Sequence, residues 1–287
     1  MKVFKAGIIL IIILILAGII TGCNNKGGFE NNGKIKVGVT ILPQAELVEA
    51  VGGELVQVKV LVPQGASPET YEPTPKDVAD FNQADIFFAL GLPAEESKGF
   101  SIDKGMKVIE LDKKVAEVYH ERKFEDTTRD PHIWLSIKRS IVMVEEIASS
   151  LGELDPENKE LYKGNANEYI AQLKDLDQKI SALLVGSKGK EFIIFHPALG
   201  YFAADYSLSM YALEEEGKEA SPGHLIAMVE LAKDKNIKGL LMTSEADAKQ
   251  GEAFAQEIGG KIVVIETLGK DYIDMMYKLA ENIGEVL

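Results

Sequence analysis

Residues 155–184 read DPENKELYKGNANEYIAQLKDLDQKISALL, and this stretch decides how the rest of the chain is organised. Pro156 suits the first position of a helix, and Asp155 before it is a residue type that caps helices. No further proline occurs up to Leu184, and apolar side chains recur at alternating steps of four and three residues, which indicates a helix with one buried face. This face consists of Tyr162, Ala166, Tyr169, Leu173, Leu176, Ile180 and Leu183. Such a helix would span about 43 Å, long enough to join two lobes.

A coiled coil is an alternative for the same apolar face. The face covers about four heptads, begins with tyrosines and lacks consistent flanking charges. These features favour packing of the helix against two lobes of the same chain.

Short apolar runs rich in β-branched residues alternate with helical patterns on both sides of this helix. The runs cover residues 34–42, 56–62, 85–90, 107–111, 190–195, 208–213, 238–242 and 261–265. Apolar strands separated by helices are typical of parallel sheets that are covered on both faces. We therefore predict an α/β fold of two lobes with parallel sheets flanked by helices, joined by one long rigid helix. The N-terminal lobe would comprise residues 34–154, the linking helix 155–186 and the C-terminal lobe 187–287.

The N-terminus has the pattern of a signal peptide. Two lysines precede an apolar run from Gly7 to Ile20, which is too short to favour a membrane span. The sequence IITGC that follows resembles a bacterial or archaeal lipobox, so we predict that residues 1–22 are removed and that Cys23 carries lipid. Residues 23–33 are polar and rich in Gly and Asn, which predicts a flexible tether. An uncleaved anchor is the alternative, and it also leaves the rest of the chain outside the membrane.

Composition excludes several classes of protein. Cys23 is the only cysteine, so the chain has no intramolecular disulfide and no zinc site built from thiolates. The formal charge is −14, and removing residues 1–22 leaves 29 basic and 45 acidic residues, a charge of −16. Such an acidic chain lacks the basic surface that nucleic-acid binding needs. Motifs for a nucleophile elbow, a phosphate loop or a dinucleotide site are absent from the sequence.

Three side chains that can bind a metal follow predicted strands. His196 comes directly after the run FIIF, Glu266 directly after IVVI, and Glu69 after VKVLVPQ and a short loop with prolines on both sides. Open α/β sheets place their ligand sites at the carboxyl ends of strands. Each residue alone is as often a core or surface residue as a ligand, but their equivalent positions make them candidates for one site.

The remaining histidines differ in their surroundings. His132, in RDPHIWLS, precedes a predicted helix, where a capping or packing role is the alternative to metal binding. The apolar face of that helix consists of Ile137, Ile141, Val144, Ala148 and Leu151. His120 lies in a charged run that we interpret as a solvated loop, and His224 lies in the expected first turn of a helix. The acidic run 214–216 is likewise interpreted as solvated surface.

Several separated segments, from about residue 34 to the C-terminus, resemble the zinc/manganese-type solute-binding lipoproteins of ABC importers. The segments are VPQGASPETYEPTPKDV, DPHIWLSIKRS, LDPENKELYKGNANEYIAQLKDLD, FHPALGYFA and IETLGKDYIDMM. The resemblance implies two α/β lobes joined by one rigid helix, with the metal held between them.

The resemblance also implies a set of ligands. The histidine of the family's DPH-x-W motif falls on His132, and the histidine before the GYF segment falls on His196. The carboxylate after the last strand, usually Asp, falls on Glu266. The first ligand, usually His in a DPHxYEP motif, falls on Glu69, which we interpret as a substituted ligand. Contact of Glu69 through water, or a site with three protein ligands, stays open.

By this resemblance the protein is expected to be a monomer without enzymatic activity, lipid-anchored at the outer face of the cell membrane. It would deliver zinc or manganese to an ABC permease. Two nitrogen and two oxygen ligands suit zinc, whereas bidentate carboxylates favour manganese or ferrous iron. Three alternatives remain: an importer component for an organic or chelated-metal ligand, a zinc hydrolase with Glu69 as general base, and a surface adhesin or scaffold.

Overall fold

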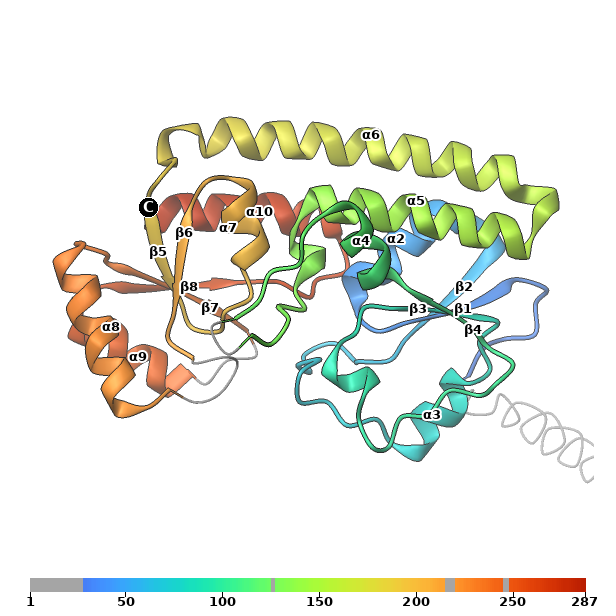
Figure 1. The fold of residues 1–287 in the computed structure, drawn as a ribbon, viewed down its shortest axis with the longest axis horizontal. Helices are drawn as coiled ribbons and strands as arrows, with labels where there is room; N and C mark the ends of the chain where they lie inside the picture. Colours follow the sequence, from blue (N-terminus) through green and yellow to red (C-terminus); the bar gives the residue numbers. More distant parts are fainter. Residues whose placement is uncertain (1–27, 125–126, 215–219, 245–247) are drawn as a thin grey trace, which may run out of the picture.

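The protein folds as two α/β lobes that lie side by side along one long helix (Figure 1). The computed structural model describes residues 28–124, 127–214, 220–244 and 248–287. The predicted signal peptide, Cys23 and the first part of the predicted tether lie outside these residues. The last part of the tether contacts the first lobe. Phe29 packs against an apolar cluster of that lobe that includes Phe81 and Phe87, and the Glu30 amide donates to Gln57 Oε1 (3.0 Å).

The first lobe is a four-stranded parallel sheet in the order β2-β1-β3-β4. Its strands are β1 (Ile35–Val39), β2 (Val56–Val60), β3 (Ile86–Ala89) and β4 (Lys107–Glu110). Its helices are α2 (Leu42–Gly52), α3 (Pro75–Phe81), α4 (Leu111–Val118) and α5 (Ile137–Leu154), with short 3-10 turns at Gly53–Leu55, Pro93–Glu95 and Ile133–Leu135.

The second lobe repeats this topology, with a parallel sheet in the order β6-β5-β7-β8. Its strands are β5 (Glu191–Ile194), β6 (Ser209–Ala212), β7 (Gly239–Thr243) and β8 (Lys261–Ile265). Its helices are α7 (Gly200–Asp205), α8 (Pro222–Asp234), α9 (Ala248–Glu257) and α10 (Tyr272–Val286). All eight strands predicted from the sequence form, and the predicted fold class is confirmed.

The linking helix α6 (Lys159–Leu183) follows a 3-10 turn at Pro156–Asn158 and runs across both lobes (Figure 1). Six of the seven residues predicted for its buried face are buried, but Leu183 is exposed. Leu184, one step of four residues beyond Ile180, is buried instead, just before the last 3-10 turn at Val185–Ser187.

Asp155 stands at the predicted cap position, but it precedes a 3-10 turn at Pro156–Asn158, so the α-helix itself begins later, at Lys159. The Asp155 carboxylate accepts hydrogen bonds from Asn158 Nδ2 (2.7 Å) and Tyr162 Oη (2.8 Å). These bonds and the nearby backbone amides of Asn158 and Glu157 lower the pKa of Asp155.

A single apolar core runs through both lobes. It joins the inner face of each sheet to helices α2, α5, α6 and α10, and includes Val39, Trp134, Leu173, Ile194 and Tyr272. Separate smaller cores cover the outer face of each sheet. Because the two lobes share their main core, they are packed together along the α6 side.

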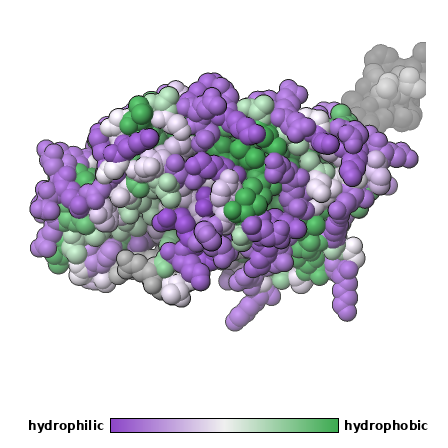
Figure 2. All heavy atoms as spheres, turned by 45° about the horizontal axis from the view of Figure 1, so that its top comes forward, coloured by the Kyte–Doolittle hydropathy of each residue, from purple (hydrophilic) through white to green (hydrophobic). Residues whose placement is uncertain are grey.

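The surface is mostly hydrophilic, with an apolar area near the middle of the face drawn in Figure 2. Within the part of the chain that the structure describes, no helix has both the length and the apolar character needed to cross a bilayer.

Candidate metal centre

Glu69 is held by a tight turn after β2. Its amide donates to Ser67 Oγ (3.2 Å), while the amides of Thr70 and Tyr71 donate to the Ser67 carbonyl. The Pro68 carbonyl accepts from Ala94 (3.0 Å), which ties the turn to the loop after β3. The Glu69 carboxylate is therefore fixed at the carboxyl edge of the first sheet, with its side chain 21% exposed.

His132 lies in the loop between α4 and α5 and is nearly fully buried. Asp130 Oδ1 accepts from both the backbone amide (3.0 Å) and Nδ1 (2.9 Å) of His132. Since a carboxylate only accepts hydrogen bonds, Nδ1 carries the proton, and Nε2 is left to bind a metal. Tyr201 of the second lobe holds the loop in place by donating its hydroxyl to the Asp130 carbonyl (3.1 Å).

His196 stands two residues after the end of β5. Its Nδ1 lies 2.7 Å from Glu214 Oε2, so Nε2 again points away from the supporting carboxylate. Glu214 follows the end of β6 by the same two residues, and Ile194 pairs with Ala212 in the sheet. The parallel register therefore brings His196 and Glu214 side by side.

Glu69, His132 and His196 converge from the two lobes. The two Nε2 atoms are 3.2 Å apart, and Glu69 Oε1 lies 3.5 Å from His132 Nε2 and 3.2 Å from His196 Nε2. Ligand atoms about 2.1 Å from a tetrahedral zinc ion are themselves about 3.4 Å apart. The three atoms are thus already spaced like ligands of one ion, and among the described residues they form a group that could hold a metal.

Glu266 does not belong to this group. It follows β8 as predicted, but its carboxylate is exposed and accepts a hydrogen bond from the Leu268 amide (2.9 Å). The structure therefore brings together three of the four residues predicted from the sequence, and the role of Glu266 remains a proposal.

Two supporting carboxylates were not recognised from the sequence. The interpretation of the acidic run 214–216 as solvated surface is wrong for Glu214, which contacts His196; the other two residues lie outside the described part. Its position relative to β6, matching that of His196 relative to β5, was the available signal. For Asp130 the available signal was its spacing, because an Asp two residues before a His can accept a hydrogen bond from the imidazole ring.

The other histidines lie apart from the cluster. His120 is exposed, and its carbonyl accepts from Arg139 Nη2 (3.3 Å). His224 Nε2 contacts the Ala212 carbonyl (3.0 Å) at the start of α8.

The cluster is strongly polarised. Burial lowers the basicity of His196, but its hydrogen bonds to Glu214 and Glu69 and their negative charges outweigh burial and raise its pKa to about 9. Burial would raise the pKa of Glu69, yet the hydrogen bond from His196 and the charges of both histidines bring that pKa below its usual value. Glu69 is therefore anionic and His196 cationic at neutral pH, so a metal must displace a proton from His196.

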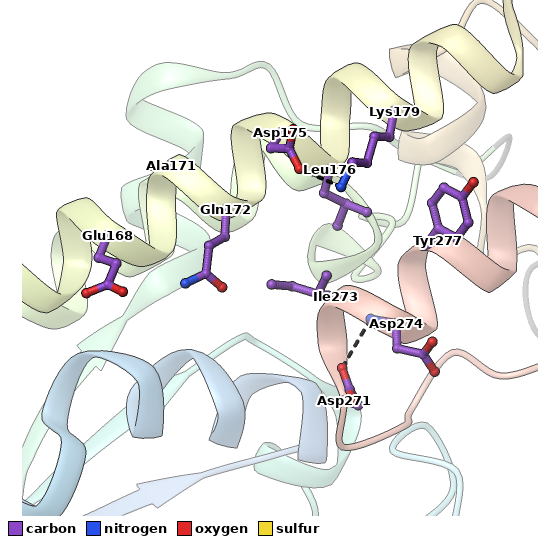
Figure 3. A pocket seen from close by; sticks show the side chains of 10 residues that line it. All are labelled: Glu168, Ala171, Gln172, Asp175, Leu176, Lys179, Asp271, Ile273, Asp274 and Tyr277. Atoms are coloured by element: carbon purple, nitrogen blue, oxygen red, sulfur yellow. Dashed lines mark hydrogen bonds and ion pairs between the residues drawn. The ribbon is translucent and has the colours of Figure 1, made fainter.

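A separate groove of about 930 Å³ lies between α6 and α10 (Figure 3). Its carboxylates include Glu168, Asp175, Asp271 and Asp274. Lys179 pairs with Asp175 (2.7 Å), and Asp271 caps α10 by accepting from the Asp274 amide (3.1 Å). None of the three cluster residues lines this groove.

Two α/β lobes of the same strand order, held along one long helix and each contributing to a His₂Glu cluster, define a two-lobed binding protein with a candidate metal site between its lobes. Residues 37–286 match the family model described as "Zinc-uptake complex component A periplasmic" (ZnuA). The chain belongs to this family.

Individual relatives agree with this assignment. The chain is 31% identical over 288 residues to the high-affinity zinc uptake system protein ZnuA of Bacillus subtilis, covering 90% of each protein. It is 31% identical over 286 residues to the zinc-binding protein AdcA of Streptococcus pyogenes; these cover 88% of this chain but only 56% of AdcA, so the chain spans about half that relative's length.

Solved structures show the same fold. A crystal structure of ZnuA superposes with a TM-score of 0.81 at 32% identity, covering 88% of this chain and 99% of that one. The Mn²⁺ complex of FpvC from Pseudomonas aeruginosa, at 24% identity and a TM-score of 0.75, covers 88% of this chain and 98% of that one.

Proposed function

We propose that this protein binds a divalent metal ion, zinc or manganese, outside the cytoplasm and delivers it to the membrane permease of an ABC importer. The observation that carries the proposal is the cluster of Glu69, His132 and His196, whose ligand atoms lie 3.2–3.5 Å apart. Membership of a zinc-uptake family supports the metal and the importer.

Glu69, His132, His196 and Glu266 are the proposed ligands, with Glu266 turning from the Leu268 amide toward the ion. Lipid attachment at Cys23 would keep the protein at the outer face of the membrane, and a streptococcal relative is named a zinc-binding lipoprotein. The family is named for uptake and not for a reaction, so the hydrolase alternative gains no support from it.

The test is competitive titration of the metal-stripped protein with zinc and manganese, beside the Glu69→Ala and Glu69→His variants. We expect one ion per chain, weaker binding in Glu69→Ala, and a shift toward zinc in Glu69→His, because imidazole is a softer ligand than carboxylate. Failure of the unmodified protein to bind either metal would refute the function. Unchanged binding in both variants would remove Glu69 from the ligand set.

A further inference from the structure

The loop that carries Glu266 belongs to the second lobe by sequence but is fastened to the first. The indole Nε1 of Trp134 donates a hydrogen bond to the carbonyl of Thr267 (2.8 Å), the residue after Glu266. Trp134 and Thr267 are both almost completely buried, at 2% and 4% exposure. Trp134 is also two residues after His132, and its ring lies against the imidazole with centroids 5.2 Å apart.

The far end of the same loop is tied to the first lobe as well. Tyr272, fully buried at the start of α10, donates its hydroxyl to the Trp134 carbonyl (2.7 Å) and lies 2.8 Å from Ser140 Oγ. Its backbone amide donates to the carboxylate of Glu46 in α2, which also accepts from Tyr169 Oη of α6 (2.8 Å). Residues 267–272 are therefore held at both ends by groups from outside the second lobe.

Glu266 itself keeps its side-chain freedom. It is exposed, and its only hydrogen bond among those identified in the described residues is to the Leu268 amide. Gly269 leaves room beside it, since a Cβ at that position would lie 3.0 Å from Glu266 Cγ. A fixed backbone with a movable carboxylate lowers the entropic cost of recruiting this ligand.

We propose that Trp134 is a positioning residue for the metal site: its indole N–H fastens the Glu266 loop to the segment that carries His132. Glu266 then approaches the ion together with Glu69 and His132, and His196 is the ligand that the body of the second lobe supplies. This inference rests on the proposed function, and in particular on Glu266 as a ligand.

The test is a double-mutant cycle with Trp134→Phe and Glu266→Gln in the purified full-length protein, measuring zinc affinity by competition with a chelator. Phenylalanine keeps a ring against His132 but removes the N–H donor. We expect Trp134→Phe to weaken zinc binding by about 10-fold, as is typical for loss of an outer-shell partner. In the Glu266→Gln background the same change should add less than about 2-fold, because the residue acts through Glu266.

Equal losses in both backgrounds would overturn the inference, since they would show a general packing effect or an effect through His132. Unchanged affinity in Trp134→Phe would overturn it too. If Glu266→Gln alone has no effect, the inference fails, while binding that depends on His132 and His196 would leave the proposed function standing. Trp134 is the only tryptophan, so its emission checks that Glu266→Gln leaves the metal-free indole environment unchanged.

A second variant covers the case in which Trp134→Phe does not fold. Tyr272→Phe removes the bond to the Trp134 carbonyl and the contact with Ser140 Oγ. Tyr162→Phe is the control, because Tyr162 is also fully buried and its hydroxyl bonds to Asp155 (2.8 Å) at the start of α6, away from the Glu266 loop. We expect weaker zinc binding in Tyr272→Phe alone. Equal affinity in the two variants would contradict the proposal.

Discussion

The two lobes have the same strand order but support their histidines in different ways. In the first lobe, His132 and its partner Asp130 come from one loop, and their side chains are 4% and 2% exposed. In the second lobe, His196 and Glu214 come from the ends of two paired strands, and their side chains are 17% and 20% exposed.

This difference shows that a repeated fold does not produce a repeated site. The register of β5 and β6 alone places Glu214 beside His196, whereas His132 depends on a loop anchored by Tyr201. His196 also contacts Glu69, so its imidazole lies between two carboxylates, and its pKa is raised well above the usual value. The second lobe therefore supplies the ligand whose proton competes with the metal.

The largest expected effect comes from removing either histidine. His132→Ala and His196→Ala should each weaken zinc binding by more than the ~10–100-fold typical of an outer-shell change. His120→Ala is the control, since that exposed side chain lies outside the cluster, and it should bind like the unmodified protein. Equal affinity in all three variants, measured by isothermal titration, would show that the site lies elsewhere.

The pH dependence of metal binding tests the role assigned to the second lobe, which supplies His196. Because the pKa of His196 is raised to about 9, a metal displaces its proton at any lower pH. Well below pH 9 the apparent Kd should therefore fall about 10-fold per pH unit, and it should level off above pH 9 at a value about 300-fold lower than at pH 6.5. If the titrating ligand were a histidine of ordinary pKa, the apparent Kd would level off near pH 6.5. A titration against pH that is flat above 7 would contradict the proposed state of His196.

The supporting carboxylates provide a smaller and more specific comparison. Glu214→Gln and Asp130→Asn should each weaken binding by about 10–100-fold. Only Glu214→Gln should also move the pH at which affinity levels off downward, because its hydrogen bond and charge raise the pKa of His196. The same downward movement in Asp130→Asn would show that the two lobes are not electrostatically distinct.

The sequence predicted the framework better than the side-chain contacts. Continuous apolar runs and the stripe on α6 are long signals that tertiary packing reinforces, so every predicted strand formed. The structure departs from the prediction only at the ends of α6, where Leu183 is exposed and a 3-10 turn separates Asp155 from the α-helix. Helix ends depend on a few local hydrogen bonds, so the apolar pattern does not fix them.

The candidate site was predictable where its residues follow from strand positions or a motif, and not where they depend on tertiary contacts. Strand ends and a known motif indicated Glu69, His132 and His196, which the fold brings together. The partnership of Glu214 with His196 needs the order and register of β5 and β6, which a hydrophobic pattern does not contain. The orientation of Glu266 depends on one hydrogen bond to an amide two residues away.

The smallest expected effect is on the stability of the metal-free protein. His196 has a folded pKa of about 9 against an ordinary 6.5, so its contribution to stability is complete below pH 6.5 and is lost as pH rises toward 9. Glu69, whose pKa is lowered from 4.5, contributes above pH 4.5 and loses that contribution as pH falls further. The metal-free protein should thus be most stable between about pH 4.5 and 6.5, with each kcal/mol lost above that window lowering Tm by ~2–4 °C. Zinc-saturated protein should lose this dependence above pH 6.5, because the bound metal keeps His196 deprotonated, so the folded and unfolded states then bind the same number of protons at this residue. Thermal melts of both forms at pH 6 and 9 decide the point, and parallel declines would show that other groups control stability in this range.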